Sequence, residues 1–112
     1  MKYALLIYSD PASFEALDDA EQQRDFGEYM ALAGEQDVIT SGQLQPATSA
    51  TTVRVDGGQA LTTDGPFADT KEILGGFYIV EADDIDRALE LAARIPAARR
   101  GGGVEVRPIV ER

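Results

Sequence analysis

The sequence contains no histidine, no cysteine and no tryptophan among its 112 residues. Without cysteine the chain can form no disulfide, thiolate nucleophile, cysteine-ligated zinc site or iron–sulfur cluster. Without histidine it has no Ser-His-Asp triad, no histidine-ligated metal and no imidazole base. We therefore expect no metal site and no bound cofactor. Any chemistry must use carboxylates, lysine, arginine, tyrosine, serine or threonine.

Basic residues are also scarce, ten against twenty acidic ones, and the formal net charge is −10. Such a charge opposes binding to nucleic acid or to an anionic membrane surface. Most of the basic residues are arginines in residues 87–112, and we expect the acidic remainder to attract this basic tail, within one chain or across a dimer.

Long apolar runs are missing too. Stretches such as Ala4 to Ile7 are far shorter than the ~20 residues of a membrane span. The opening residues resemble a signal peptide, but acids and turn residues follow at once without a small-residue cleavage site. We expect a soluble, cytoplasmic protein with one domain over residues 1–112, since single domains most often have roughly 100–150 residues.

The residue pattern predicts strands and two helices. One helix begins after an Asp18 cap with Glu21 as its partner and ends at Gly34, and Asp83 is expected to cap the other, which ends before Pro96. In the first helix, apolar residues recur with the helical period at Phe26, Tyr29, Met30 and Ala33. The predicted strands are Lys2–Ser9, Val38–Gln45, Thr51–Val55, Gln59–Thr63, Ile73–Glu81 and Val104–Val110.

Glycines punctuate this pattern at two places. Asp56-Gly57-Gly58 lies between the third and fourth predicted strands and is a strong hairpin signal, because both glycines tolerate a positive φ. Gly75-Gly76 lies inside the strand Ile73–Glu81 and indicates a bulge or a close backbone approach. The hairpin is therefore an insertion between two β-α-β units.

With the hairpin set aside, the order β-α-β-β-α-β predicts an α+β, ferredoxin-like fold with both helices on one sheet face. The strands Lys2–Ser9 and Ile73–Glu81 are nevertheless apolar on both faces. A second copy pressed sheet to sheet would cover the free face and form a dimeric α/β barrel with a small interior. The alternative is that the hairpin folds over this face as a lid.

The densest polar segment is Asp64-Gly-Pro-Phe-Ala-Asp-Thr-Lys-Glu72, which joins the hairpin to a strand that is apolar on both faces. In one interpretation, Gly65-Pro66 fixes a turn, Phe67 anchors it in the core and Asp64 accepts backbone N–H bonds across the loop. In the other, Asp64, Lys71 or Glu72 faces an enclosed cavity that perturbs its pKa.

This segment, followed by Leu74-Gly-Gly-Phe-Tyr78, resembles the defining stretch of the DGPF-type YCII-related proteins. The resemblance continues in Lys2–Tyr8, Leu44-Gln45-Pro46, Thr51–Val55, Ala93–Ala98 and Val104–Ile109, and so covers nearly the whole chain. It implies a ferredoxin-like, dimeric α+β barrel. Some relatives carry a His and Asp pair in the barrel, which implies enzymes; here only the Asp half is represented, with Asp64 the matching residue. Other relatives resemble proteins encoded beside, or fused to, alternative sigma factors.

Two functions follow as hypotheses. In the first, the homodimer cavity binds a small, fairly apolar molecule and supports cofactor-free proton transfer, with Asp64 as the base and Lys71 stabilising negative charge. In the second, the protein is a regulatory or interaction module with a protein partner. Ser41 and Gln43 share a strand face and are further candidate hydrogen-bond donors to a ligand. The expected ligand-binding residues are Tyr8, Phe67, Glu72, Tyr78 and Arg107.

Overall fold

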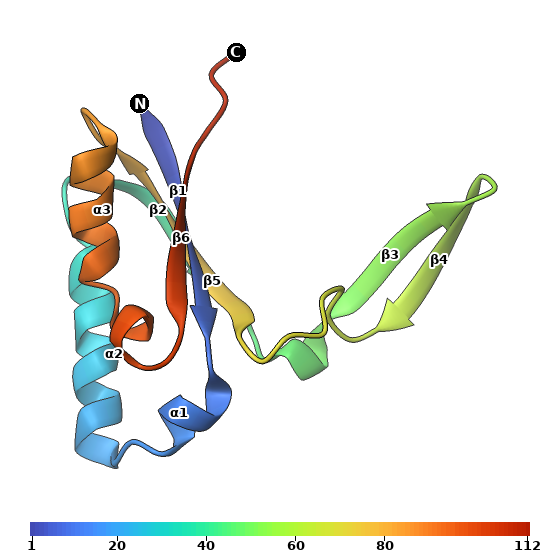
Figure 1. The fold of residues 1–112 in the computed structure, drawn as a ribbon, viewed down its shortest axis with the longest axis horizontal. Coiled ribbons are helices and arrows are strands. Elements are labelled where there is room, and N and C mark those ends of the chain that lie inside the picture. Colours follow the sequence, from blue (N-terminus) through green and yellow to red (C-terminus); the bar gives the residue numbers. More distant parts are fainter.

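The computed structural model describes residues 1–112 and contains a four-stranded sheet, a separate two-stranded hairpin and three α-helices (Figure 1). The strands are β1 (Lys2–Ser9), β2 (Val38–Gln43), β3 (Thr51–Asp56), β4 (Gln59–Asp64), β5 (Ile73–Glu81) and β6 (Gly103–Pro108). The helices are α1 (Pro11–Glu15), α2 (Asp19–Ala33) and α3 (Ile85–Ala93), with 3₁₀ turns at η1 (Ala47–Ser49) and η2 (Pro96–Arg99). None of the helices is long and apolar enough to cross a membrane.

The sheet has the strand order β2-β5-β1-β6, and all neighbouring strands are antiparallel. Helices α2 and α3 lie on one face of it, and the hairpin lies on the other side (Figure 1). This is the predicted ferredoxin-like α+β arrangement with an inserted hairpin. The bulge is also confirmed, because the β1–β5 register shifts beside Gly75.

The helix caps confirm one prediction and correct another. Asp18 accepts a hydrogen bond from the Glu21 N–H at 2.8 Å, and α2 ends at Gly34, as expected. The second cap is Asp84, not Asp83, and it accepts from the Arg87 N–H at 3.1 Å. A cap must directly precede the first helical residue, and α3 begins at Ile85.

The sequence pattern is wrong at several other boundaries. Strand β2 ends at Gln43 rather than Gln45, and β6 ends at Pro108 rather than Val110. Helix α1 is not predicted at all. It begins directly after Asp10, whose carboxylate accepts from the Ala12 N–H at 3.1 Å, and Pro11 occupies its first turn, where a missing N–H costs nothing.

The core lies between the sheet and the two long helices. On the sheet it includes Tyr3, Leu5 and Ile7 from β1, which alternate with Ala4, Leu6 and Tyr8 on the open face. The remaining core residues are Leu32, Tyr78, Val80, Ala82, Ala88, Leu91, Ala92, Ile95 and Ala97. The expected apolar stripe of α2 is only partly buried: Phe26 and Met30 are exposed, while Leu32 and the carboxylate of Asp25 face inward.

The open face of the sheet, defined here as Ala4, Leu6, Phe77 and Ile79 with their neighbours, is apolar at its centre. Leu6 pairs with Phe77 and Ala4 with Ile79 across β1 and β5. On β6, Glu105 and Arg107 lie on this face at its edge and form an ion pair at 3.7 Å. No helix covers this face in a single copy (Figure 1).

The β3–β4 hairpin projects away from the body and does not act as a lid over the sheet (Figure 1). Gly57 and Gly58 form its turn with φ values of 58° and 80°, as predicted. The projection makes the molecule extended: its radius of gyration is 15.7 Å, against about 13 Å for a compact domain of this length.

The basic tail pairs with earlier acidic residues of the same chain, as the charge distribution predicts. Arg99 and Arg100 both bind Asp25, at 3.2 Å and 3.1 Å. Arg100 makes two hydrogen bonds to this carboxylate and holds the pKa of Asp25 below its usual value, although burial opposes the shift. Arg99 and Arg100 therefore fasten η2 to α2.

Candidate functional site

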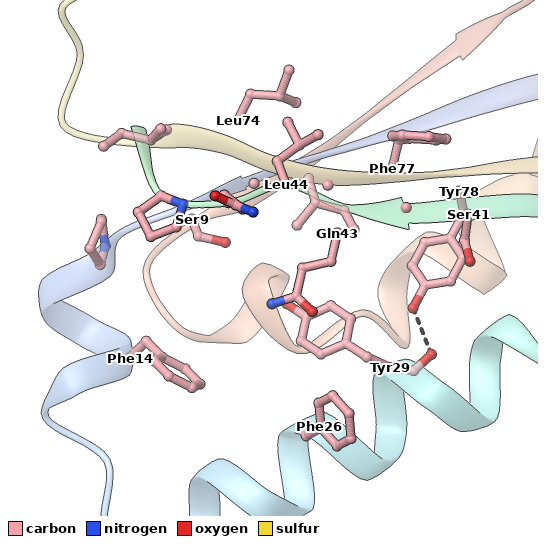
Figure 2. A pocket seen from close by; sticks show the side chains of 18 of the residues that line it. Ser9, Phe14, Phe26, Tyr29, Ser41, Gln43, Leu44, Leu74, Phe77 and Tyr78 are labelled. Carbon is pink, nitrogen blue, oxygen red and sulfur yellow. Dashed lines mark hydrogen bonds between the residues drawn. The ribbon is translucent and has the colours of Figure 1, made fainter. Parts of the chain in front are cut away.

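A groove lies between helices α1 and α2 on one side and the ends of β2 and β5 on the other (Figure 2). Its volume is about 550 Å³, within the range of roughly 300–1,000 Å³ usual for small-molecule sites. The helix side contributes Phe14, Phe26, Tyr29 and Met30. The groove exists because α2 does not cover the edge strand β2 completely.

The lining of the groove carries no charged side chain, although 27% of the chain's residues are charged. Its polar side chains are those of Ser9, Ser41, Gln43, Gln45 and the two tyrosines Tyr29 and Tyr78. Charged ligands lose hydration on entering such a surface without gaining an ionic partner. The groove is therefore suited to a neutral, largely apolar molecule with one or two hydrogen-bonding groups.

The two tyrosines are fixed in their neutral form. The Tyr78 hydroxyl donates to the Tyr29 carbonyl at 2.7 Å, and the Tyr29 hydroxyl accepts from the Ala97 N–H at 3.2 Å (Figure 2 shows the first bond). Burial raises the pKa of Tyr78 to about 12 and also raises the pKa of Tyr29. Neither phenol is a base near neutral pH.

Ser41 and Gln43 share the helix side of β2, as the strand alternation predicts. They pair with Tyr78 and Gly76 of β5, and both line the groove. The Gln43 side chain extends toward Tyr29 (Figure 2). Neither side chain makes a hydrogen bond within the protein, so a ligand can use both.

The apolar wall of the groove is the part that the sequence analysis missed. Phe14 belongs to the unpredicted helix α1, and Phe26 and Met30 were assigned to a helical stripe without an indication that they would be exposed. Periodicity identifies the apolar side of a helix but not how much of it a neighbour covers. The sequence did contain one indication of the groove: Leu44-Gln45-Pro46, where the chain leaves the sheet after β2, also lines it.

The segment Asp64–Glu72 lies outside the groove, at the base of the hairpin. Asp64 is exposed and its carboxylate forms no hydrogen bond, so the expected bonds to backbone amides are absent. The turn is closed instead by Gly65 N–H to the Ala50 carbonyl at 2.7 Å and by the Thr52 hydroxyl to the Gly65 carbonyl at 2.8 Å. Phe67 is not anchored in the core: it is 71% exposed, beneath the guanidinium of Arg54.

The other expected site residues are dispersed. Lys71 is exposed and lies 3.8 Å from Asp10, and Glu72 is half-buried in the same connection. Tyr8 and Arg107 lie on or beside the open face, whereas Tyr78 points to the helices. Within one copy, Tyr78 lines the groove together with Ser41 and Gln43, whereas Asp64 and Lys71 do not line it.

A second hollow, of about 410 Å³, is lined by acidic residues and by Arg87 near the start of α3. Arg87 binds Asp37 at 2.7 Å and Glu90 at 3.2 Å, so part of this charge is neutralised. These acids are not grouped in a way that could hold a metal ion.

Comparisons with known proteins agree with this architecture. The YCII-related domain matches the chain over residues 1–112. An uncharacterized protein of Rhizobium meliloti (strain 1021) is 34% identical over 116 aligned positions, covering 97% of this chain and 92% of that protein. Among solved structures, 5-chloro-2-hydroxyhydroquinone dehydrochlorinase from Burkholderia phenoliruptrix AC1100, in complex with 2,5-dihydroxybenzoquinone, is similar with a TM-score of 0.55 and 16% identity, over 98% of this chain and 94% of that one.

Proposed function

The chain belongs to the YCII-related domain family, and from that premise we propose that it binds a small, neutral, largely apolar molecule in the groove between α1, α2 and β2. The observation that carries this proposal is the absence of any charged side chain from the lining of a cavity of about 550 Å³. Ser41 and Gln43 supply the hydrogen bonds that orient the ligand, and the aromatic wall supplies the apolar contact.

The ligand bound to the structural neighbour supports a ligand of single-ring size. That enzyme is described with a single-ring dihydroxybenzoquinone bound to it, and the two chains share a fold. A ring of this kind is compatible with a groove whose walls carry Phe14, Phe26 and Tyr29. Because a dihydroxybenzoquinone is ionised near neutral pH, only its ring size carries over, and we propose an uncharged single aromatic ring as the preferred ligand class.

Two fluorescent probes with the same ring system test the proposal. N-phenyl-1-naphthylamine is neutral, and 8-anilinonaphthalene-1-sulfonate adds one sulfonate. We expect the neutral probe to bind with at least tenfold higher affinity, because an anion loses hydration in the groove and is repelled by a chain of net charge −10. Equal affinities, or no binding of the neutral probe, would contradict the proposal.

Matched lysine substitutions locate the binding site. Met30→Lys places a charge in the groove, and Leu89→Lys places one on α3, outside it; both side chains are exposed, at 58% and 47%. We expect Met30→Lys to weaken binding of the neutral probe at least tenfold, with Leu89→Lys unchanged. Thermal melts of both variants show whether the fold is retained. Equal losses in the two variants would place the probe elsewhere.

We also propose that the protein is a homodimer through the open face. Four of its central residues are apolar and no element of the same chain covers them, and an interface of this kind is chiefly apolar. Light scattering at micromolar concentration should give the mass of two chains, and high salt should not dissociate them. Ile79→Lys should dissociate the dimer, with Leu89→Lys as the control. A monomeric wild-type protein would overturn this part.

On the basis of the segment Asp64–Glu72, we further propose acid/base chemistry in a cavity between two copies. Asp64 and Lys71 are exposed and lie outside the groove in one copy, so a second copy would have to enclose them. With Asp64 as base, Asp64→Asn should abolish exchange of a carbon-bound proton next to the carbonyl of a bound neutral ketone, while leaving probe binding intact. Proton exchange at an unchanged rate in the variant would remove Asp64 from this role.

A regulatory or interaction module without catalysis is the second candidate function. The specific observation in its favour is the exposed hairpin, which offers Val53 and Val55 on one face as a surface for docking. Two results together would favour this candidate: probe binding that Met30→Lys weakens, and a dimer affinity that substitutions in the hairpin leave unchanged. The hairpin would then be free for another protein.

A further inference from the structure

One face of the β3–β4 hairpin is apolar and nothing in the chain covers it. Val53 pairs with Thr62 and Val55 with Ala60, so these four residues share a face, which ends in the pair Thr51 and Asp64 at the base of the hairpin. Val53 is 61% exposed and Val55 is 71% exposed. We call this set the valine face.

The opposite face of the hairpin is partly covered from within the chain. It carries Arg54 and Leu61, which are paired across the two strands. The guanidinium of Arg54 lies 4.8 Å from the centre of the Phe67 ring, so the segment after β4 returns to shield this face near its base. The valine face has no comparable partner.

The hairpin is also without support from the body. It forms a sheet of its own and shares no ladder with the other four strands, and Figure 1 shows it extending away from them. A two-stranded hairpin alone is at best marginally stable in water. Beyond their cross-strand pairs, Val53 and Val55 would stabilise it further if something outside this copy buried them.

The occupant that fits is a second copy of the chain. The hairpin extends on the side of the sheet where the open face lies, so a copy seated on the open face would lie beside the hairpin (Figure 1). Two chains of net charge −10 repel each other except where acids are absent. Val53, Val55, Ala60 and Thr62 carry no charge, and neither does the centre of the open face; the one acid on this side of the hairpin is Asp64, at its base.

We propose that the hairpin is a clasp whose valine face packs against a second copy of the chain. The proposal rests on the homodimer proposed above and is independent of the ligand groove. In a twofold dimer each copy contributes one clasp, so any substitution acts twice. The clasp thus holds together two copies whose sheet faces alone would form a smaller interface.

The dimer dissociation constant tests the clasp. Val53→Thr with Val55→Thr keeps the β-branched shape but replaces two methyl groups by hydroxyls. Leu61→Thr is the control, which replaces an apolar side chain by a smaller polar one on the opposite face. Sedimentation velocity over a range of concentrations should show at least a tenfold weaker dimer for the double variant. The Leu61→Thr control should change it less than threefold.

Cross-linking gives a second measurement. Because the chain has no cysteine, single cysteines can be labelled with a benzophenone maleimide. Ala60→Cys places the label on the valine face, and Gln59→Cys places it one residue away on the other face. Illumination should produce a covalent dimer from Ala60→Cys and at least fivefold less from Gln59→Cys.

The outcomes separate the proposals. A monomeric wild-type protein at all concentrations overturns the clasp and the dimer together. The clasp alone is overturned if wild type is a dimer, the double variant dimerises as tightly as wild type, and labelled Ala60→Cys gives no covalent dimer. Binding of N-phenyl-1-naphthylamine should be the same in these variants as in wild type. If wild type does not bind this probe, the groove proposal is overturned and the clasp proposal is not affected.

Discussion

In the body of the molecule, formed by the four-stranded sheet with α2 and α3, 12 apolar side chains are buried in one cluster, whereas no residue of β3 or β4 is buried. The body is stabilised by packing between residues far apart in the sequence. The hairpin depends on a local turn and on cross-strand pairs. The comparison teaches that one short chain can contain a part held by long-range packing and a part held only by local contacts.

The largest expected effect comes from truncating the body. Leu91 is fully buried and Leu61 of the hairpin is 49% exposed. Leu91→Ala should lower the free energy of unfolding by about 3 kcal/mol through lost burial and a cavity, and Leu61→Ala by less than about 0.5 kcal/mol. Urea denaturation measures both. Similar losses for the two substitutions would break the distinction between body and hairpin.

Asp25 gives the next effect, because its buried carboxylate ties α2 to η2. Asp25→Asn should cost about 2 kcal/mol at pH 7, since hydrogen bonds to a charged group are lost. The pKa of Asp25 is lowered in the folded state, chiefly by the Arg100 hydrogen bond. Its contribution is therefore full above the unfolded pKa of about 3.9 and disappears as pH falls through the folded value.

Urea titrations of wild type and Asp25→Asn at pH 7 and at pH 3 check this prediction. The difference between the two proteins should shrink at the lower pH. A difference that is the same at both pH values would show that Asp25 acts by packing and not by its charge.

Tyr78 should produce a smaller effect at neutral pH and a distinct one in alkali. Tyr78→Phe removes the hydrogen bond to the Tyr29 carbonyl and should cost about 1 kcal/mol at pH 7. Since burial raises the pKa of Tyr78 to about 12, its hydroxyl stays protonated to a higher pH in the folded state than in the unfolded state. Wild-type stability should fall between pH 10 and 12.

In Tyr78→Phe this alkaline loss should be smaller, and melts at pH 9 and pH 11 give the comparison. Tyr29 also has a raised pKa and remains in the variant, so some pH dependence should persist. An unchanged alkaline loss in the variant would exclude Tyr78 as its main source.

Asp64 at the base of the hairpin should have the smallest effect on stability. Its exposed carboxylate forms no hydrogen bond, so Asp64→Asn should change the free energy of unfolding by less than about 0.5 kcal/mol at pH 7. Chemical denaturation of a dilute, monomeric sample provides the test. A loss above 1 kcal/mol would mean that the hairpin base is fastened to the body more firmly than the contacts indicate.

The same contrast explains which features could be predicted. The hairpin turn at Gly57-Gly58 and the Asp18 cap are local, and a few adjacent residues determine each of them. The ferredoxin-like α+β fold class follows from the strand and helix patterns and the family resemblance. Phe67 and Phe26, by contrast, are apolar residues whose burial depends on how much surface a distant element covers, which sequence alone does not record.

The same distinction between local and long-range features applies to the candidate site. Ser41 and Gln43 were identified because alternation along one strand places them together. The groove itself could not be predicted, because it arises where α1 and α2 leave β2 uncovered, and α1 has too few residues for a periodic signal. The binding and catalytic roles of Tyr8, Phe67, Glu72, Tyr78, Arg107, Asp64 and Lys71 stay predictions.

The pairing of β1 with β6 has a consequence for the order in which the chain folds. Tyr3 lies opposite Pro108, so on the order of 100 residues must be synthesised before this ladder can close. The hairpin, in contrast, can form within microseconds of leaving the ribosome. Until β6 arrives, the apolar strand Lys2–Ser9 presents an unpaired edge, and during that interval the nascent chain is most exposed to aggregation and to chaperones.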